Sequence, residues 1–193
     1  MYINDIHILY YVLFGFIGIV VGQITDWCNI RLSEYKKVIS KEFFKMYFKN
    51  FIPKYILMFI TAIIYIGILY TCGLAELKTY SYMILTPMLL SVIVIDYKKQ
   101  IIPNRLTLTM FEFGLIFAFL QGISNLNVAI DSILGMIVGV GIFLFITFVG
   151  SLISGKEAMG FGDVKLIGAL GLFFRMEKHN CNIDFIIFNR SYI

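Results

Sequence analysis

Long runs of apolar residues alternate with short polar segments along most of this 193-residue chain. An α-helix needs about 20 mostly apolar residues to cross the hydrocarbon core of a bilayer, and five of the runs come close to that length. The pattern predicts membrane-spanning helices at residues 8–24, 55–72, 80–95, 106–123 and 128–153, with a shorter apolar run at 164–174. The predicted fold class is all-α: a polytopic membrane helix bundle of five to six transmembrane segments.

The long polar segment at residues 26–54 carries a different pattern. Within EYKKVISKEFFKMYFK, apolar residues recur at helical spacing, and a stripe of lysines lies on the opposite side: Lys37, Lys41, Lys45 and Lys49. This predicts an amphipathic helix on the membrane surface with its lysines facing anionic headgroups. A connecting helix with a solvated basic face fits the pattern nearly as well.

Composition agrees with a membrane protein, because 60% of the residues are hydrophobic and only 15% are charged. The lipid bilayer is therefore the first predicted partner. Nucleic-acid binding would need a separate folded domain, for which the length leaves little room, so no nucleic acid is expected. The opening MYINDIH contains no Lys or Arg, so we expect the first apolar segment to be retained rather than cleaved as a signal peptide.

Basic residues in the loops predict the orientation, because Lys and Arg are kept on the cytoplasmic side. Segments 26–54, 96–105 and 154–165 hold seven, three and two basic residues. The loops on the other side hold only Lys78. We therefore expect a cell-membrane protein whose N-terminus lies outside.

Two acids mark the candidate site: Asp96 in SVIVIDYKKQIIPNRLTL and Asp163 in GFGDVKL. Two predicted spans separate them, so both lie on the same side of the membrane, which the orientation makes the cytoplasmic side. Pro103 and Asn104 follow Asp96 closely and indicate a short non-helical loop. Before Asp163, two glycines, Gly160 and Gly162, allow unusual backbone conformations and close approach of another segment.

Either acid alone is more simply explained, Asp163 as a helix-capping residue and Asp96 as a polar end to a span. Together on one side, each beside an irregular loop, they favour function, since ionisable groups at a membrane are costly. Two facing carboxyl groups, one ionised and one protonated, can activate a water and protonate the carbonyl that it attacks. The predicted chemistry is peptide hydrolysis. The three cysteines lie far apart without a CxxC spacing, so no metal site and no cofactor is expected.

The pairing of Asp96 and IPNRLTL with GFGDVKL and IGALG resembles the type IV prepilin peptidases, bacterial membrane aspartic proteases of the GxGD class. The resemblance implies that Asp96 and Asp163 are the catalytic pair, with the motif residues around them in support: Gly160, Gly162, Lys165, Pro103 and Asn104. It implies prepilin-like or pseudopilin substrates of type IV pili or type II secretion, cut behind a short basic leader at the cytoplasmic face. GIVVGQITDWCNIRL is similar to the family's opening helix at Gly22, Arg31 and Leu32.

The chain departs from the family pattern in two places. Its loop 26–54 lacks the paired CxxC motifs of many members, which puts the family's N-methylation in doubt here. The run after GxGD gives way to RMEKHNCNIDFIIFNRSYI, which is polar and irregular. We therefore expect a peptidase domain at 1–174 and an atypical or truncated tail at 175–193, with weak or no activity from such a shortened member.

Two other functions remain open. A presenilin-type intramembrane protease shares GxGD, but its two aspartates lie on adjacent helices and no PAL tripeptide follows here. A non-enzymatic transport or secretion subunit would use the acids as ion or proton sites. Within the fourth span, Glu112 is interpreted as a protonated or hydrogen-bonded interior residue, with a third catalytic acid or a substrate contact as alternatives. Lys165 either steadies the Asp163 charge, holds a substrate carbonyl or is a plain interfacial lysine.

Overall fold

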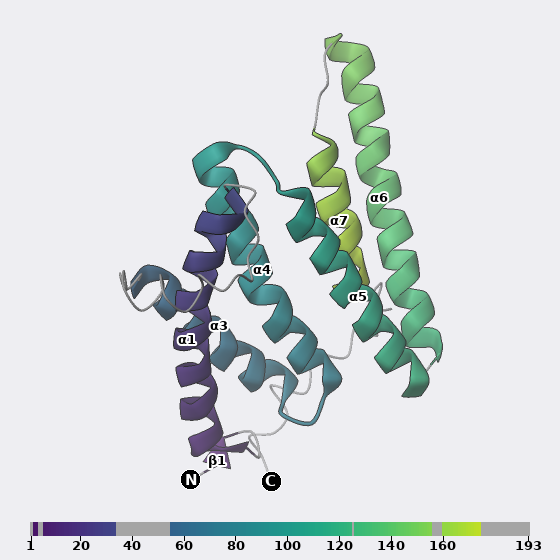
Figure 1. The fold of residues 1–193 in the computed structure, drawn as a ribbon. Coiled ribbons are helices and arrows are strands. Elements are labelled where there is room, and N and C mark those ends of the chain that lie inside the picture. Colours follow the sequence, from purple (N-terminus) through teal and green to yellow (C-terminus); the bar gives the residue numbers. More distant parts are fainter. Residues whose placement is uncertain (1, 4–5, 34–54, 125, 156–159, 175–193) are drawn as a thin grey trace, which may run out of the picture.

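The computed structural model describes residues 2–3, 6–33, 55–124, 126–155 and 160–174. Two short strands at the start, β1 (Tyr2–Ile3) and β2 (Ile6–His7), pair antiparallel. The rest of the described chain is helices and short connections (Figure 1). The helices are α1 (Ile8–Ser33), α3 (Tyr55–Cys72), α4 (Leu77–Lys99), α5 (Asn104–Ser124), α6 (Leu126–Ser154) and α7 (Phe161–Phe173).

Five of these helices, α1, α3, α4, α5 and α6, are long and apolar enough to cross a membrane. They contain the five spans that the apolar runs predict, so the prediction of an all-α multi-pass membrane bundle is confirmed. The sixth run forms α7, whose 13 residues cover about 20 Å at helical rise. The predicted amphipathic helix within 26–54 falls mostly outside the described residues, although α1 continues through the first part of that segment to Ser33. The predicted tail, 175–193, also lies outside them.

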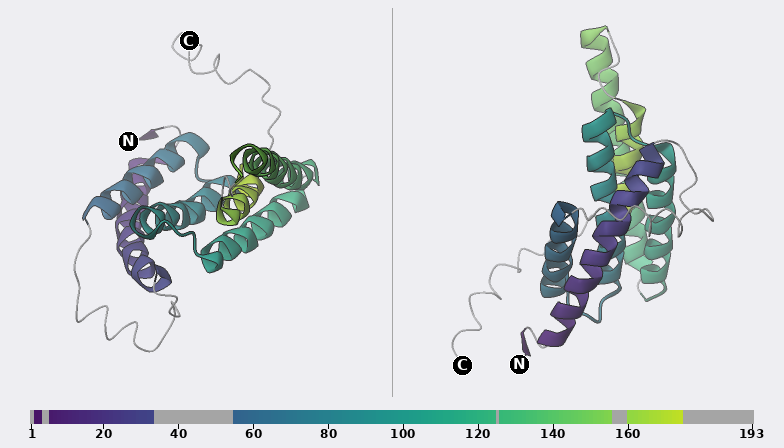
Figure 2. Two further views of the ribbon diagram at one scale, coloured as in Figure 1. Left: turned by 90° about the horizontal axis from the view of Figure 1, so that it is seen from above. Right: turned by 60° about the vertical axis from the view of Figure 1, so that its left-hand side comes forward.

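The helices form two groups that meet where α4 packs against α5 (Figures 1 and 2). In the first group, α1 and α3 approach closely at small residues. A Cβ built on Gly18 would lie 2.7 Å from the Ala62 Cα atom, and the Thr61 hydroxyl donates a hydrogen bond to the Gly18 carbonyl at 2.6 Å. The Tyr65 hydroxyl donates to the Met83 carbonyl at 2.8 Å and so links α3 to α4. Small residues let helix backbones approach in lipid, where no hydrophobic effect drives them together.

In the second group, α7 packs between α5 and α6. A Cβ built on Gly135 would lie 2.6 Å from the Gly171 carbonyl oxygen, and Gly139 faces Ile167. Gly135 and Gly139 of LGMIVGVGIF therefore form a packing face against α7. Gly141 is exposed, and no described side chain or neighbouring helix lies within 4 Å of a Cβ built on it. One turn of helix separates residues that share a face, and Gly141 lies off that face.

The main core lies where α4, α5 and α7 meet. Leu85, Val92 and Ile95 of α4 pack against residues of α5 and α7, the most buried of which are Met110 and Ala169, both at 0% exposure. This core joins the helix that ends after Asp96 to the helix that begins before Asp163. The two candidate acids therefore stand on elements that share one packed centre.

Candidate active site

Asp96 lies in the last turn of α4, beside a tight helix ending. Gln100 adopts a left-handed conformation with φ 53°, and its backbone N–H donates to the Asp96 carbonyl at 2.7 Å. A left-handed residue is a common way to end a helix. The chain then runs through Ile101, Ile102 and the buried Pro103 before α5 begins at Asn104. This is the short non-helical loop that the IPN motif predicts.

Asp163 lies in the first turn of α7. Gly160 precedes the helix in an extended conformation, and the Asp163 backbone N–H donates to the Gly160 carbonyl at 3.1 Å. The first turn of a helix has free N–H groups and a positive dipole end, so it favours a carboxylate. Asp163 is half-buried, whereas Asp96 is exposed.

Two contacts bring the motifs together. A Cβ built on Gly162 would lie 3.3 Å from the Ile102 Cβ atom, which is tighter than ordinary packing, so the absence of a side chain lets the two segments meet. The Lys165 ammonium donates a hydrogen bond to the Asn104 side-chain oxygen at 3.1 Å. Residues 102–104 and 162–165 therefore form one surface at one end of the bundle, although about 60 residues separate them in sequence.

The two carboxyl groups make no direct polar contact with each other among the described residues. Across the described residues, no hydrogen bond or ion pair joins the Asp96 and Asp163 side chains to one another. Catalytic contacts are often long or absent before substrate binds, and they tighten in the complex with substrate. No group of three His, Cys, Asp or Glu side chains in the described part of the chain is placed to hold a metal ion.

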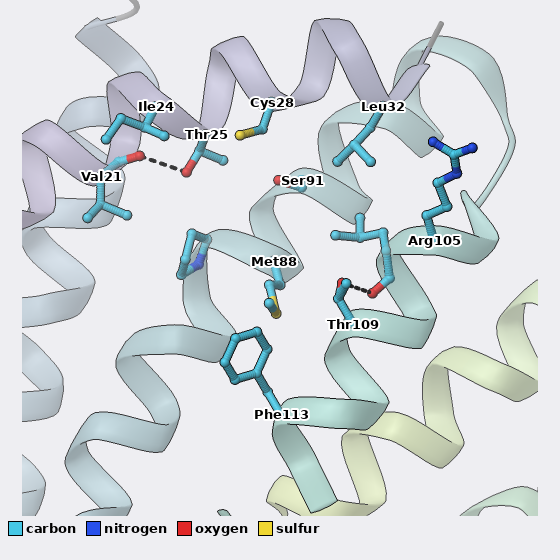
Figure 3. A pocket seen from close by; sticks show the side chains of 12 residues that line it. Val21, Ile24, Thr25, Cys28, Leu32, Met88, Ser91, Arg105, Thr109 and Phe113 are labelled. Carbon is cyan, nitrogen blue, oxygen red and sulfur yellow. Dashed lines mark hydrogen bonds between the residues drawn. The ribbon is translucent and has the colours of Figure 1, made fainter. Parts of the chain in front are cut away.

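A cavity of about 640 Å³ opens between α1, α4 and α5 beside this end of the bundle (Figure 3). Its wall is mainly apolar: Val21, Ile24 and Leu32 come from α1, and Met88 and Phe113 face them from α4 and α5. Arg105, directly after Asn104, stands at its edge. A second cavity, of about 470 Å³, lies between α5, α6 and α7, and both Asn104 and Lys165 line it.

Sequence reasoning missed a set of buried polar residues near the end of α1. Gln23, Asp26 and Asn29 are each at most 7% exposed, and both amide atoms of Asn29 are buried without a hydrogen-bond partner among the described residues. The signal was present in QITDWCN, where polar residues recur every three positions on an apolar helix. A buried unpaired amide is costly, so this face of α1 is a further candidate for contact with a polar ligand.

A family model described as "Type IV leader peptidase family" matches residues 83–191, which are more than half of the chain. The match contains both motifs. The chain belongs to this family. No solved structure matches it.

Curated relatives of this leader peptidase family member carry the name prepilin leader peptidase/N-methyltransferase. The chain is 36% identical to that of Aeromonas hydrophila over 93 residues, 48% of this chain and 31% of the relative. It is 38% identical to that of Neisseria gonorrhoeae over 93 residues, which are 48% of this chain and 32% of the relative. It is 34% identical to that of Escherichia coli K12 over 82 residues, which are 42% of this chain and 35% of the relative. The matched segments thus span about a third of the length of these relatives. The predicted resemblance to prepilin peptidases is confirmed.

Proposed function

We propose that this chain is an aspartic endopeptidase that removes short basic leaders from prepilin-like membrane proteins. The observation that carries the proposal is the joining of the two motifs through the Ile102–Gly162 and Asn104–Lys165 contacts. These contacts place the start of α5, which follows Asp96 after a short loop, beside the start of α7, which carries Asp163. Membership of the leader peptidase family and the names of the relatives support the same reaction.

In the proposed mechanism, a peptide carbonyl and a water occupy the space between Asp96 and Asp163. The ionised carboxylate takes a proton from the water as its oxygen attacks the carbonyl carbon, and the protonated carboxyl donates to the carbonyl oxygen. Collapse of the tetrahedral intermediate breaks the C–N bond. The leaving amine takes the proton that the first carboxyl group received from the water, and the other carboxylate regains its proton as the carbonyl re-forms. Lys165, held by Asn104, would keep the start of α7 in place, and it supplies a positive charge two residues after Asp163.

The substrate arrangement follows from the membrane. An apolar substrate helix stays in the bilayer, and its basic leader stays in the cytosol, so the bond between them reaches the interface where both motifs lie. The cavity between α1, α4 and α5 offers apolar side chains of the substrate a place beside the site. Orientation with the N-terminus outside and the site at the cytoplasmic face rests on the loop lysines. The proposal covers cleavage alone, because loop 26–54 carries no CxxC motif.

A cleavage assay tests the proposal. Membranes containing the chain are incubated with a single-span substrate that has a short basic leader, and the product is resolved by mass. We expect the wild type to release the leader, and Asp96→Asn and Asp163→Asn to release none at equal abundance. Asp131→Asn near the start of α6 is the matched control and should cleave like the wild type. Absence of cleavage by the wild type, or clear cleavage by either site variant, would contradict the proposal.

A further inference from the structure

Glu112 lies on the outward face of α5, so its interpretation as an interior residue is wrong. Its side chain is exposed, and the residues that share its face are also exposed: Leu108 57%, Leu115 42%, Ile116 51%, Phe119 71% and Ile123 70%. The opposite face of α5, with Leu106, Met110 and Phe117, packs into the core. The acid therefore lies in the middle of an apolar stripe that faces away from the bundle.

The depth of Glu112 makes this position unusual. It lies eight residues after Asn104, the first residue of α5, which is about 12 Å along the helix. Among the described residues, no other Asp, Glu, Lys or Arg is both exposed and more than two turns from the nearest end of its helix. Within that part of the chain, the Glu112 side chain makes no hydrogen bond or ion pair. A polar group exposed to lipid at this depth is costly unless another molecule supplies a partner.

We infer that the outward face of α5 is a helix-docking surface, and that its occupant is the same face of a second copy of this chain. In its neutral form a carboxyl group both donates and accepts a hydrogen bond, so two Glu112 side chains complement each other. All copies insert in the same orientation, which brings both acids to the same depth without further adjustment. A two-fold axis along the membrane normal then places each residue of the stripe opposite its own counterpart.

The surrounding side chains suit such an interface. Leu108, Leu115 and Phe119 lie one or two turns from Glu112 on the same face and would pack around the paired carboxyl groups. Interhelical hydrogen bonds in membranes are modest in strength, so the apolar stripe has to supply packing as well. The docking surface points away from the core residues of α5, although Leu108 at its edge also lines the smaller cavity beside α6 and α7.

Disulfide formation between single cysteines tests the inference. In a background without Cys28, Cys72 and Cys181, a cysteine at Leu108, Leu115 or Phe119 should give a disulfide-linked dimer when membranes are oxidised. A cysteine at Ile63, 67% exposed on α3, is the control and should stay monomeric. Equal linking from Ile63 and from α5, or no linking from α5, overturns the inference.

Substitutions of Glu112 separate a second copy from other occupants. Association is measured by energy transfer between two fluorescent copies as the vesicles are diluted with lipid. Glu112→Gln keeps a donor and an acceptor and should associate like the wild type, whereas Glu112→Leu should associate about tenfold more weakly. If Glu112→Gln weakens association as much as Glu112→Leu, the two Glu112 carboxyl groups do not pair with each other, and a cationic partner is indicated. If Glu112→Leu changes only substrate cleavage, the face binds substrate and the inference fails.

Discussion

The close contact between α6 and α7 gives a prediction for Gly135→Ala. A Cβ at this position would lie 2.6 Å from the Gly171 carbonyl oxygen, whereas comfortable carbon–oxygen contacts begin near 3.3 Å. The two helices would therefore have to separate by about 0.7 Å. Such overpacking typically costs about 1–3 kcal/mol, while replacing glycine by alanine within a helix gains about 0.8–1.0 kcal/mol. We expect a net loss of stability of up to about 2 kcal/mol.

Gly141→Ala is the matched control, because it makes the same substitution on the same helix. Among the described residues, no side chain or neighbouring helix lies within 4 Å of a Cβ built on Gly141, so only the helix-propensity gain applies. The two variants should therefore differ by about 1–3 kcal/mol in their free energy of unfolding, measured by reversible denaturation in mixed micelles or bicelles. Equal stabilities would show that α6 and α7 do not pack through Gly135 and Gly171. Since α7 carries Asp163, the less stable variant should also cleave substrate more slowly.

Three further predictions concern other contacts. Gly162→Ala should slow cleavage about tenfold or more with little change in abundance, because its Cβ would press on Ile102 at 3.3 Å and shift the motifs apart; wild-type rates would contradict this. Thr61→Val should lower the free energy of unfolding by about 1 kcal/mol, because the bond to the Gly18 carbonyl is lost, and an unchanged unfolding midpoint would refute it. In intact cells, cysteines placed at Lys99 and Phe161 should resist an impermeant thiol reagent, while a cysteine at Leu126 should react. If the cysteines at Lys99 and Phe161 label oppositely, the two motifs lie on opposite sides of the membrane.

The arrangement of spans could be predicted from sequence because the bilayer leaves few alternatives. An apolar run of about 20 residues in lipid must satisfy its own backbone hydrogen bonds, so it forms a helix. The loop at Pro103 and the helix start at Asp163 were also predictable, because Pro and Gly restrict or free the backbone locally. These signals depend on neighbours in sequence. The family followed from the same motifs.

The neighbours of each helix could not be predicted in this way. Gly139 and Gly141 stand two residues apart in one apolar run, yet only Gly139 faces another helix. The sequence predicts an interior position for Glu112, because acids in spans usually face inward. In the structure, Met110, two residues earlier, lies on the buried side of α5, and Glu112 lies on the exposed side. The Asn104–Lys165 hydrogen bond joins residues 61 positions apart, and no local pattern indicates it. The roles of Asp96 and Asp163 stay predictions.

A disulfide between Ile102→Cys and Gly162→Cys tests most directly whether the two motifs form one site. The Cβ atoms at these positions would lie 3.3 Å apart, close to the 3.5–4.5 Å span typical of disulfides. In a background free of other cysteines, mild oxidation of membranes should remove both thiols from labelling by a polymer-linked maleimide, and reduction should restore them. A control pair, Ile102→Cys with Gly141→Cys, should keep both thiols reactive when the membranes are dissolved in denaturing detergent before labelling. If the Ile102 and Gly162 pair also stays fully reactive, the motifs do not meet and the proposed active site is wrong.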